Sequence, residues 1–298
     1  MAKATPRVLI SSSPPLGPDD VIYHYTSIGG LLGILDANAN PAKPPQLRLW
    51  ASNLNFLNDS SEFTLAFDLA VLALETKKKI PRKIVEGIKS ELEKKKNSPG
   101  EQQQFFTCSV TTRSDDLSQW RGYGGNNGYA IGFKKDELEK YLHDNSKPFE
   151  LKKCLYVSHP ERWDQFEEED PGKTISKRTN KLVNDLIKKT NPKDWQKIID
   201  RGIGHLTYIK ERSFKDEDEF RIISTIQFPG DKLKFREGHS NLIPYVEIEL
   251  DYSLLKRIIV GPSPNINLAE QAIRLLKDSR SFLSKIEINH SQIPFRNW

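Results

Sequence analysis

Short apolar runs alternate with amphipathic stretches along most of the chain. Residues 21–26 form a β-branched and aromatic run, which predicts a strand. Alternate side chains of a strand share a face, so one face should carry Ile22, His24 and Thr26, and the other Tyr23 and Tyr25. A histidine and a hydroxyl side by side at a strand end could grip a small ligand. The alternative is a core histidine that precedes a helix cap.

The same patterns assign most of the remaining chain. Strands are predicted at 47–52, 104–110, 129–133, 151–157, 243–250, 255–260 and 285–288, and a charged loop runs into a strand over 214–223. Helices are predicted at 27–36, 59–75, 81–95, a short stretch after residue 114, and 267–277. The expected caps are Thr26 or Ser27, then Asp59 with Glu62 three residues later, then Ser114 or Asp115.

A charged stretch from about 160 to 210 interrupts this order and predicts a helical insertion. The strands and helices mix without a regular βαβ rhythm, which favours an α+β fold. We therefore expect a flexible arm at 1–20 and a single domain at 21–298 that contains the insertion.

Composition limits the classes of protein to consider. The chain has 298 residues, 37% hydrophobic and 29% charged, with a net charge of +5. No apolar run is long enough for a membrane helix, and no signal-peptide core precedes residue 20. Cys108 and Cys154 are unpatterned, so a reducing compartment, by default the cytoplasm, is expected. The lysine runs at 77–79, 94–96 and 188–189 fit solvated helix faces and permit nucleic-acid contact without requiring it.

Known catalytic motifs are mostly missing. The six histidines show no zinc-ligand spacing, so no metal site is expected. There is no Gly-x-Ser-x-Gly elbow, and Cys108 on an apolar strand fits a buried small hydrophobe. The five glycines between 122 and 132 fit turns and close approaches better than a phosphate loop.

The acidic stretch 217–221 is the second candidate for chemistry. If strand geometry holds from Glu217, then Glu217, Glu219 and Arg221 share one face. This arrangement is either an ion-pair ladder or a catalytic carboxylate held by a charged neighbour.

Five blocks of the chain stand in a specific order. They are Tyr23–Ser27 with Gly30-Leu31 and Ile34-Leu35; Leu49–Ser52 with Asn58-Asp59 and Glu62; Thr107–Ser109 with Leu117, Gln119-Trp120 and Gly128–Phe133; Phe214-Lys215 with Glu217–Arg221; and Ile259–Pro262 with Ser291–Arg296. In this order they resemble the bacterial family known as domain of unknown function 2971, over about residues 21–296. That family is similar in turn to the ADP-ribosyltransferase-like fold, which has an early His-x-Thr strand and a late Glu-x-Glu strand.

The resemblance implies a role for each candidate residue. His24 and Thr26 would grip the ribose of NAD, and Glu219 would stabilise the ribosyl cation, with Glu217 the less favoured carboxylate. Packing on the nicotinamide would fall to Trp120, Tyr25 or Tyr123. The second NAD-binding element would be Thr107–Ser109, the nearest substitute for a Ser-Thr-Ser strand. Ser109 and Arg221 complete the expected cofactor-binding set.

Three functions follow as hypotheses. The first is an NAD-dependent mono-ADP-ribosyltransferase, a toxin or antiphage effector that modifies nucleic acid or protein and could have an antitoxin partner. The second is a non-catalytic module that senses NAD, ADP-ribose or a phage component in the same groove. The third, suggested by the lysine runs alone, is a nucleic-acid-binding protein or nuclease.

Overall fold

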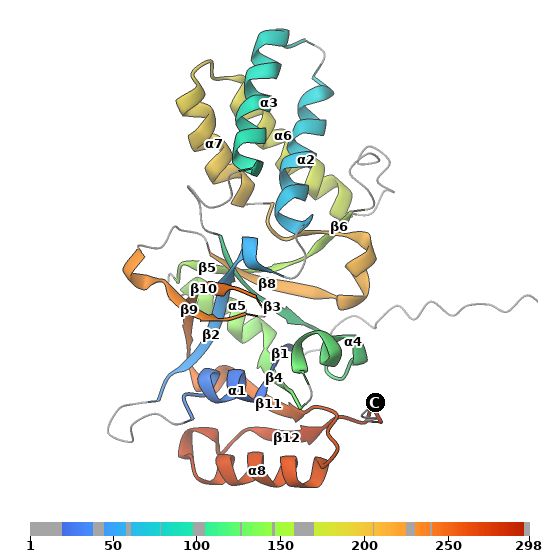
Figure 1. Cartoon of the computed structure of the whole chain (residues 1–298), viewed down its shortest axis with the longest axis vertical. Helices are drawn as coiled ribbons and strands as arrows, with labels where there is room; N and C mark the ends of the chain where they lie inside the picture. Colours follow the sequence, from blue (N-terminus) through green and yellow to red (C-terminus); the bar gives the residue numbers. More distant parts are fainter. Residues whose placement is uncertain are drawn as a thin grey trace, which may run out of the picture.

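One large sheet organises an α+β fold (Figure 1). The computed structural model describes residues 20–37, 45–57, 61–77, 79–97, 105–125, 127–144, 147–157, 170–204, 206–224, 230–238 and 240–294, with the main chain alone at 61–63, 170–176 and 201. Residues 1–19 of the expected arm and the expected cap at Asp59 lie outside these residues. So does the side chain of Glu62.

The large sheet has ten strands and is mostly antiparallel. Its strands are β1 (Val21–Thr26), β2 (Leu47–Asn53), β3 (Phe106–Thr111), β4 (Tyr129–Lys134), β5 (Phe149–Lys153), β8 (Glu219–Ser224), β9 (Lys234–Glu237), β10 (Leu242–Leu250), β11 (Leu255–Val260) and β12 (Glu287–His290). Eight of them follow the order β12-β11-β4-β1-β3-β2-β10-β9, and β8 and β5 extend from β3. Among the described strands of this sheet, only β11 and β12 pair in parallel. A separate two-stranded parallel sheet joins β6 (Leu155–Val157) to β7 (Ile209–Glu211).

Strand β3 divides one of its edges between two neighbours. Thr111 near its C-terminal end pairs with Tyr23 of β1, and Thr107 near its N-terminal end pairs with Ser52 of β2. Among the described residues, the edge of β3 from Cys108 to Val110 has no strand partner on this side, whereas its opposite edge pairs with β8 from Thr107 to Thr111. We call this gap between β1 and β2 the fork. The fork begins beside His24 of β1, one residue beyond the pairing of Tyr23 with β3.

Three helices cover the core of the sheet. They are α1 (Ile28–Ile34), α5 (Lys135–Asp144) and α8 (Ile266–Asp278). Ser27 caps α1, since its hydroxyl accepts from the N–H of Gly30 at 3.2 Å. The core beneath includes apolar side chains from alternate positions of the strands, among them Ile22, Leu49, Phe106, Phe133 and Ile222.

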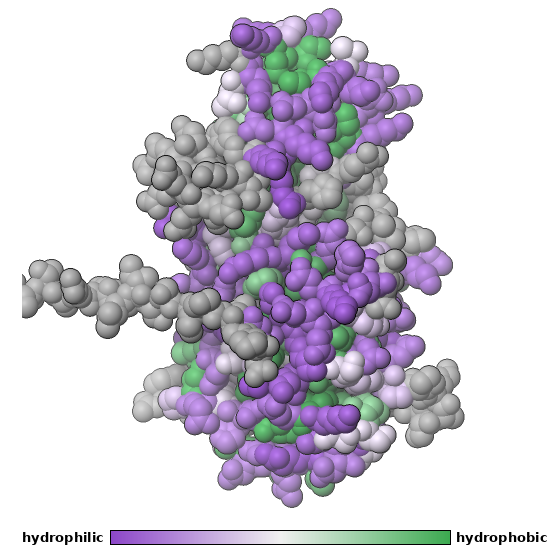
Figure 2. Space-filling view, turned by 180° about the vertical axis from the view of Figure 1, so that it is seen from behind, coloured by the Kyte–Doolittle hydropathy of each residue, from purple (hydrophilic) through white to green (hydrophobic). Residues whose placement is uncertain are grey.

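Four other helices form a bundle at one end of the molecule (Figure 1). They are α2 (Ser61–Glu75), α3 (Arg82–Asn97), α6 (Asp170–Ile187) and α7 (Pro192–Gly204), and they share a second apolar core. Lysines at the end of α3 bind acids on other helices: Lys95 pairs with Asp200 at 2.7 Å and Lys96 with Asp68 at 2.5 Å. These lysines hold the bundle together and are not simply a solvated face. Figure 2 shows the opposite side of the molecule, where the described surface is predominantly hydrophilic.

The structure confirms most predicted elements and corrects several. The α+β class is confirmed, as are the alternate faces of β1: Ile22 lies in the main core, whereas Tyr23 and Tyr25 lie in a separate cluster with Trp120. Residues 151–157 were wrongly predicted as one strand, because two strands from different sheets meet there. The helical prediction up to residue 210 was also wrong, because β7 begins at Ile209.

The α5 helix and the β9 strand were among the elements not predicted. Both are dominated by charged residues, and β9 has a single apolar residue, Phe235. The short helix after residue 114 exists as α4 (Leu117–Gln119), but its cap is Asp116, one residue later than expected.

Candidate functional site

His24 fills the fork with its imidazole. Main-chain pairing fixes β1 against β4 from Val21 to Thr26, whereas its pairing with β3 stops at Tyr23. In place of the missing ladder bonds, His24 Nδ1 lies 2.9 Å from the carbonyl oxygen of Ser109 and 3.5 Å from Cys108 Sγ. A carbonyl oxygen can only accept, so Nδ1 carries the hydrogen and Nε2 keeps its lone pair. Burial lowers the pKa of His24, which keeps the ring neutral.

Glu219 lies at the start of β8, within a buried group of charges. Arg221 Nε donates to Glu219 Oε1 at 2.9 Å, and Lys210 Nζ lies 2.9 Å from Oε2. Lys210 also binds Glu217 Oε2 at 2.7 Å. Arg221 Nη1 donates to the carbonyl oxygen of Thr207 at 2.6 Å, so the residues that follow the helical bundle help to hold the site.

Burial alone would raise the pKa of Glu219. Arg221 and Lys210, helped by the hydroxyl of Ser109, outweigh burial and hold the pKa at about 2. The carboxylate is therefore ionised at neutral pH, although Glu219 is only 4% exposed.

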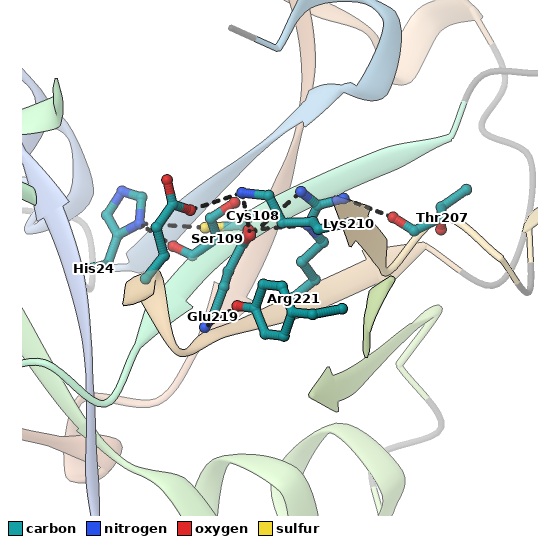
Figure 3. Close-up of polar contacts among 9 residues, drawn as sticks. His24, Cys108, Ser109, Thr207, Lys210, Glu219 and Arg221 are labelled. Carbon is teal, nitrogen blue, oxygen red and sulfur yellow. Dashed lines mark hydrogen bonds and ion pairs between the residues drawn. The ribbon is translucent and has the colours of Figure 1, made fainter. Parts of the chain in front are cut away.

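Ser109 joins the two candidate catalytic residues. Its main-chain oxygen accepts from His24, and its hydroxyl donates to the carboxylate of Glu219. Figure 3 shows this arrangement, with His24 at one end of the group, Thr207 at the other, and Ser109 between them. Three residues predicted for the site from distant parts of the chain thus lie together, and Arg221 lies beside them. Their roles toward NAD remain predictions.

The acidic stretch corrects one expectation. A short 3₁₀ helix, η4 (Arg212–Glu217), precedes β8, and Asp218 turns the chain with a φ of 40°. Glu217 is therefore outside the strand, and the expected three-residue face of 217, 219 and 221 does not form. Lys210 nevertheless brings the two glutamates together from a third element.

The aromatic candidates lie on the other face of β1. The rings of Tyr25 and Trp120 meet edge-on with centroids 4.5 Å apart. Trp120 Nε1 donates to Asp115 Oδ1 at 2.7 Å, and Tyr25 Oη donates to the carbonyl oxygen of Arg113 at 2.8 Å. Both side chains are buried and hydrogen-bonded within the protein. Of the three nicotinamide-packing candidates, only Tyr123 is well exposed, at 41%.

The nearby glycines have structural reasons to be glycine. A Cβ on Gly261 would come within 2.8 Å of both the Trp120 ring and the carbonyl oxygen of Gly128. A Cβ on Gly128 would lie 2.3 Å from the Cα of Gly124, and Gly125 has a φ of 61°. Turns and close approaches account for these positions, as the sequence predicted. Thr26 likewise packs against Gly30, where a Cβ would meet its hydroxyl.

Cys108 is buried, as expected of a small hydrophobe on an apolar strand. Burial raises the pKa of its thiol to about 12, with Glu219 adding to the shift, so the reactive thiolate is scarce at neutral pH. Among the described residues, no group of three or more His, Cys, Asp and Glu side chains could hold a metal ion. Within the same ranges, none of the helices has the length and apolar character needed to cross a membrane.

Sequence reasoning missed three residues of this region, Lys210, Ser52 and Arg236. Lys210 was placed at the end of a helical stretch, although the preceding Thr207-Tyr208-Ile209 is a β-branched and aromatic run of the kind that favours a strand. Arg236 Nη2 donates to Ser52 Oγ at 3.1 Å beside the fork. No local sequence signal places Arg236 of β9 within reach of Ser52 of β2, since β10 lies between the two strands.

The charge of Glu219 predicts how stability depends on pH. A carboxyl pKa held at about 2, against about 4.3 in an unfolded chain, stabilises the fold fully above pH ~4.3 and loses that effect as pH falls toward 2. The full effect is about 3 kcal/mol. We expect urea unfolding to show that Glu219→Gln lowers stability at pH ~7 and that its deficit shrinks on acidification. A deficit independent of pH would contradict this account.

Comparison with known proteins gives one result. Residues 119–222 match the model of a family described as protein of unknown function (DUF2971). No curated protein matches the chain, and neither does any solved structure. The matched segment begins beside Trp120 and runs through Lys210, Glu219 and Arg221 to the middle of β8. The resemblance of the chain to this family rests on that segment.

Proposed function

We propose that this chain is an NAD-dependent mono-ADP-ribosyltransferase with an ADP-ribosyltransferase-like fold. One observation carries the proposal: His24 from the early strand and Glu219 from the late strand converge on Ser109 at a break in the sheet. Neutral His24 can accept a ribose hydroxyl at Nε2 while Nδ1–H stays on the Ser109 carbonyl. In this proposal a ligand would reach the imidazole at the break in the sheet, where β1 and β3 do not pair.

The proposed chemistry uses the fixed charge of Glu219. Nicotinamide leaves with the electron pair of its bond to C1′ of the ribose, and positive charge develops on the sugar. An ionised carboxylate positioned beforehand lowers the free energy of that charge in the transition state. An acceptor nucleophile then bonds to C1′ and loses its proton. With water the products are ADP-ribose, nicotinamide and a proton.

Reaching the carboxylate requires an exchange of hydrogen bonds. A carboxylate has about four lone-pair sites. Arg221 donates from Nε at 2.9 Å and Nη2 at 3.3 Å, and Lys210 and the Ser109 hydroxyl contact the carboxylate as well. Ser109 is the neutral donor among them, so a ribose hydroxyl could replace it without a change of charge. In this proposal the Ser109 hydroxyl occupies the position on the carboxylate that a ribose hydroxyl takes when NAD binds.

The hydrogen bonds that already occupy the Glu219 carboxylate favour a second candidate function. A carboxylate that keeps two cations has less of its charge available to a ribosyl cation. A module that binds NAD or ADP-ribose at the fork without cleaving it would use His24 and Thr26 alone. The two candidate functions differ in whether the chain cleaves NAD.

Nicotinamide release is the test of the proposed function. The purified chain is incubated with NAD labelled in the adenosine half, with total RNA, DNA and protein as acceptors. We expect free nicotinamide and label on one class of macromolecule, which would fit a toxin or antiphage effector that an antitoxin could restrain. Binding of NAD by calorimetry without nicotinamide release would support the sensing module. If NAD neither binds nor is cleaved, both candidates fail.

A further inference from the structure

Arg236 is a partly buried arginine whose one described partner is neutral. It lies on β9, and its Nη2 donates to Ser52 Oγ at 3.1 Å. Within the described ranges it has no ion pair, whereas Arg48, on the same sheet face, pairs with Asp36 at 3.9 Å and Glu247 at 3.7 Å. Burial lowers the pKa of Arg236, yet a guanidinium remains charged in proteins. A partly buried cation without a counter-charge costs folding free energy that an incoming anion would offset.

Thr107 provides a second, independent observation. It lies directly opposite Ser52 in the pairing of β2 with β3, so the two side chains share a face. Thr107 is 3% exposed, and its Oγ1 is buried without a hydrogen-bond partner among the described residues. Native proteins satisfy most buried polar atoms, so an orphaned hydroxyl calls for an explanation such as a ligand. Its partner on the neighbouring strand, Ser52, is the residue that accepts the hydrogen bond from Arg236.

We propose that Arg236, Ser52 and Thr107 form a binding subsite for a phosphoryl group. The guanidinium offers planar, charge-assisted donors that match phosphate oxygens, and the two hydroxyls can each donate one more hydrogen bond. Tyr245 lies opposite Ser52 on its other side and stacks on Trp50 with ring centroids 4.9 Å apart. This aromatic pair forms a rigid flank for the subsite.

The subsite adjoins the fork. The charge of Arg236 is close enough to act on both His24 and Cys108. If the proposed function holds, the subsite takes the pyrophosphate of NAD while His24 binds a ribose. That extension rests on the proposed function, whereas the phosphoryl site does not.

Binding of inorganic pyrophosphate to the full chain tests the subsite. We expect saturable binding in calorimetry, weakened about tenfold or more by Arg236→Gln through loss of charge-assisted bonds. Lys234→Gln is the matched control, because Lys234 lies two residues away on β9 and pairs with Glu247 at 2.8 Å. The control should bind within about twofold of the natural chain, as expected of an exposed charge. Equal losses in both variants, or no binding to the natural chain, would overturn the proposal.

Thr107→Val separates a ligand contact from a structural one. Valine keeps the shape of threonine and removes the orphaned hydroxyl, so the melting temperature should stay level or rise. The affinity for pyrophosphate should fall at the same time. Unchanged affinity, or a parallel fall in affinity and stability, would count against a role for Thr107 in binding.

The two proposals fail in different ways. The chain could bind pyrophosphate in a way that depends on Arg236 and yet never release nicotinamide. That result would support the phosphoryl subsite and contradict the transferase proposal. Nicotinamide release with the same Michaelis constant for NAD in Arg236→Gln as in the natural chain leaves the transferase and removes the subsite.

Discussion

Glu219→Gln should lower the rate of nicotinamide release from NAD by about 100- to 1,000-fold, the usual cost of removing one positioned electrostatic group from an active site. Glutamine keeps the shape and a hydrogen-bond acceptor but removes the negative charge that, in our proposal, stabilises the ribosyl cation. The loss should fall on kcat, because the charge matters most where positive charge develops. Steady-state kinetics with labelled NAD measures the effect.

Glu217→Gln is the matched control for this substitution. Both glutamates bind Lys210, so each substitution removes one carboxylate partner of that lysine. Glu217 is outside β8 and more exposed, and its variant should keep its rate within about threefold, as for a group that stabilises no transition-state charge. Equal losses in the two variants would show that the rate depends on the ion pairs of Lys210 and not on the charge of Glu219.

Folding of Glu219→Gln needs its own check, because the substitution leaves two buried cations short of a carboxylate. Near-ultraviolet circular dichroism and thermal melting show whether the variant is folded at the assay temperature. His24→Gln offers a second route if it is not. It should weaken NAD binding with a smaller effect on kcat, since the proposed contact of the imidazole with the ribose would form in both ground and transition states.

Arg221→Met should destabilise the fold by about 3–5 kcal/mol, the typical cost of removing one member of a buried ion pair. Arg221 is 1% exposed, and its guanidinium bonds both Glu219 and the carbonyl oxygen of Thr207. Methionine fills much of the space but removes the guanidinium, which leaves Lys210 as the described cation at the carboxylate. Urea unfolding at neutral pH measures the difference.

Arg274→Met is the control for that loss. Arg274 pairs with Glu270 one turn earlier on α8, on the surface of the helix, at 2.6 Å. A surface pair of this kind contributes about 0.5 kcal/mol, so its loss should scarcely move the unfolding midpoint. A loss of about 1 kcal/mol or less for Arg221→Met would mean that the buried charges contribute little to stability.

The predictions from sequence succeeded where local patterning decides the outcome. The alternation in residues 21–26 gave the right faces for His24 and Tyr25, because a strand has a period of two whatever it packs against. The order of the blocks also predicted that His24, Ser109 and Glu219 belong to one site. Resemblance rather than patterning supplied that step.

The predictions missed features that depend on tertiary contacts. Lys210 is a charged residue in a short buried strand. No pattern in the neighbouring sequence predicts its ion pairs with Glu217 and Glu219. Arg236 reaches Ser52 across 184 residues of sequence, through pairings of β9 with β10 and of β10 with β2. The fork itself is an absence of pairing along three residues of β3. The Phe-Thr-Cys-Ser-Val-Thr sequence of β3 gives no sign of which residues lack a partner on one edge.

The most direct test of the central claim is a crystal structure of the chain soaked with NAD. The claim is that His24 and Glu219 serve one ribose. We expect the nicotinamide ribose within hydrogen-bond distance of both His24 Nε2 and the Glu219 carboxylate, with the Ser109 hydroxyl turned away from that carboxylate. NAD bound elsewhere, or bound at the fork with Ser109, Lys210 and Arg221 all still on Glu219, would contradict it.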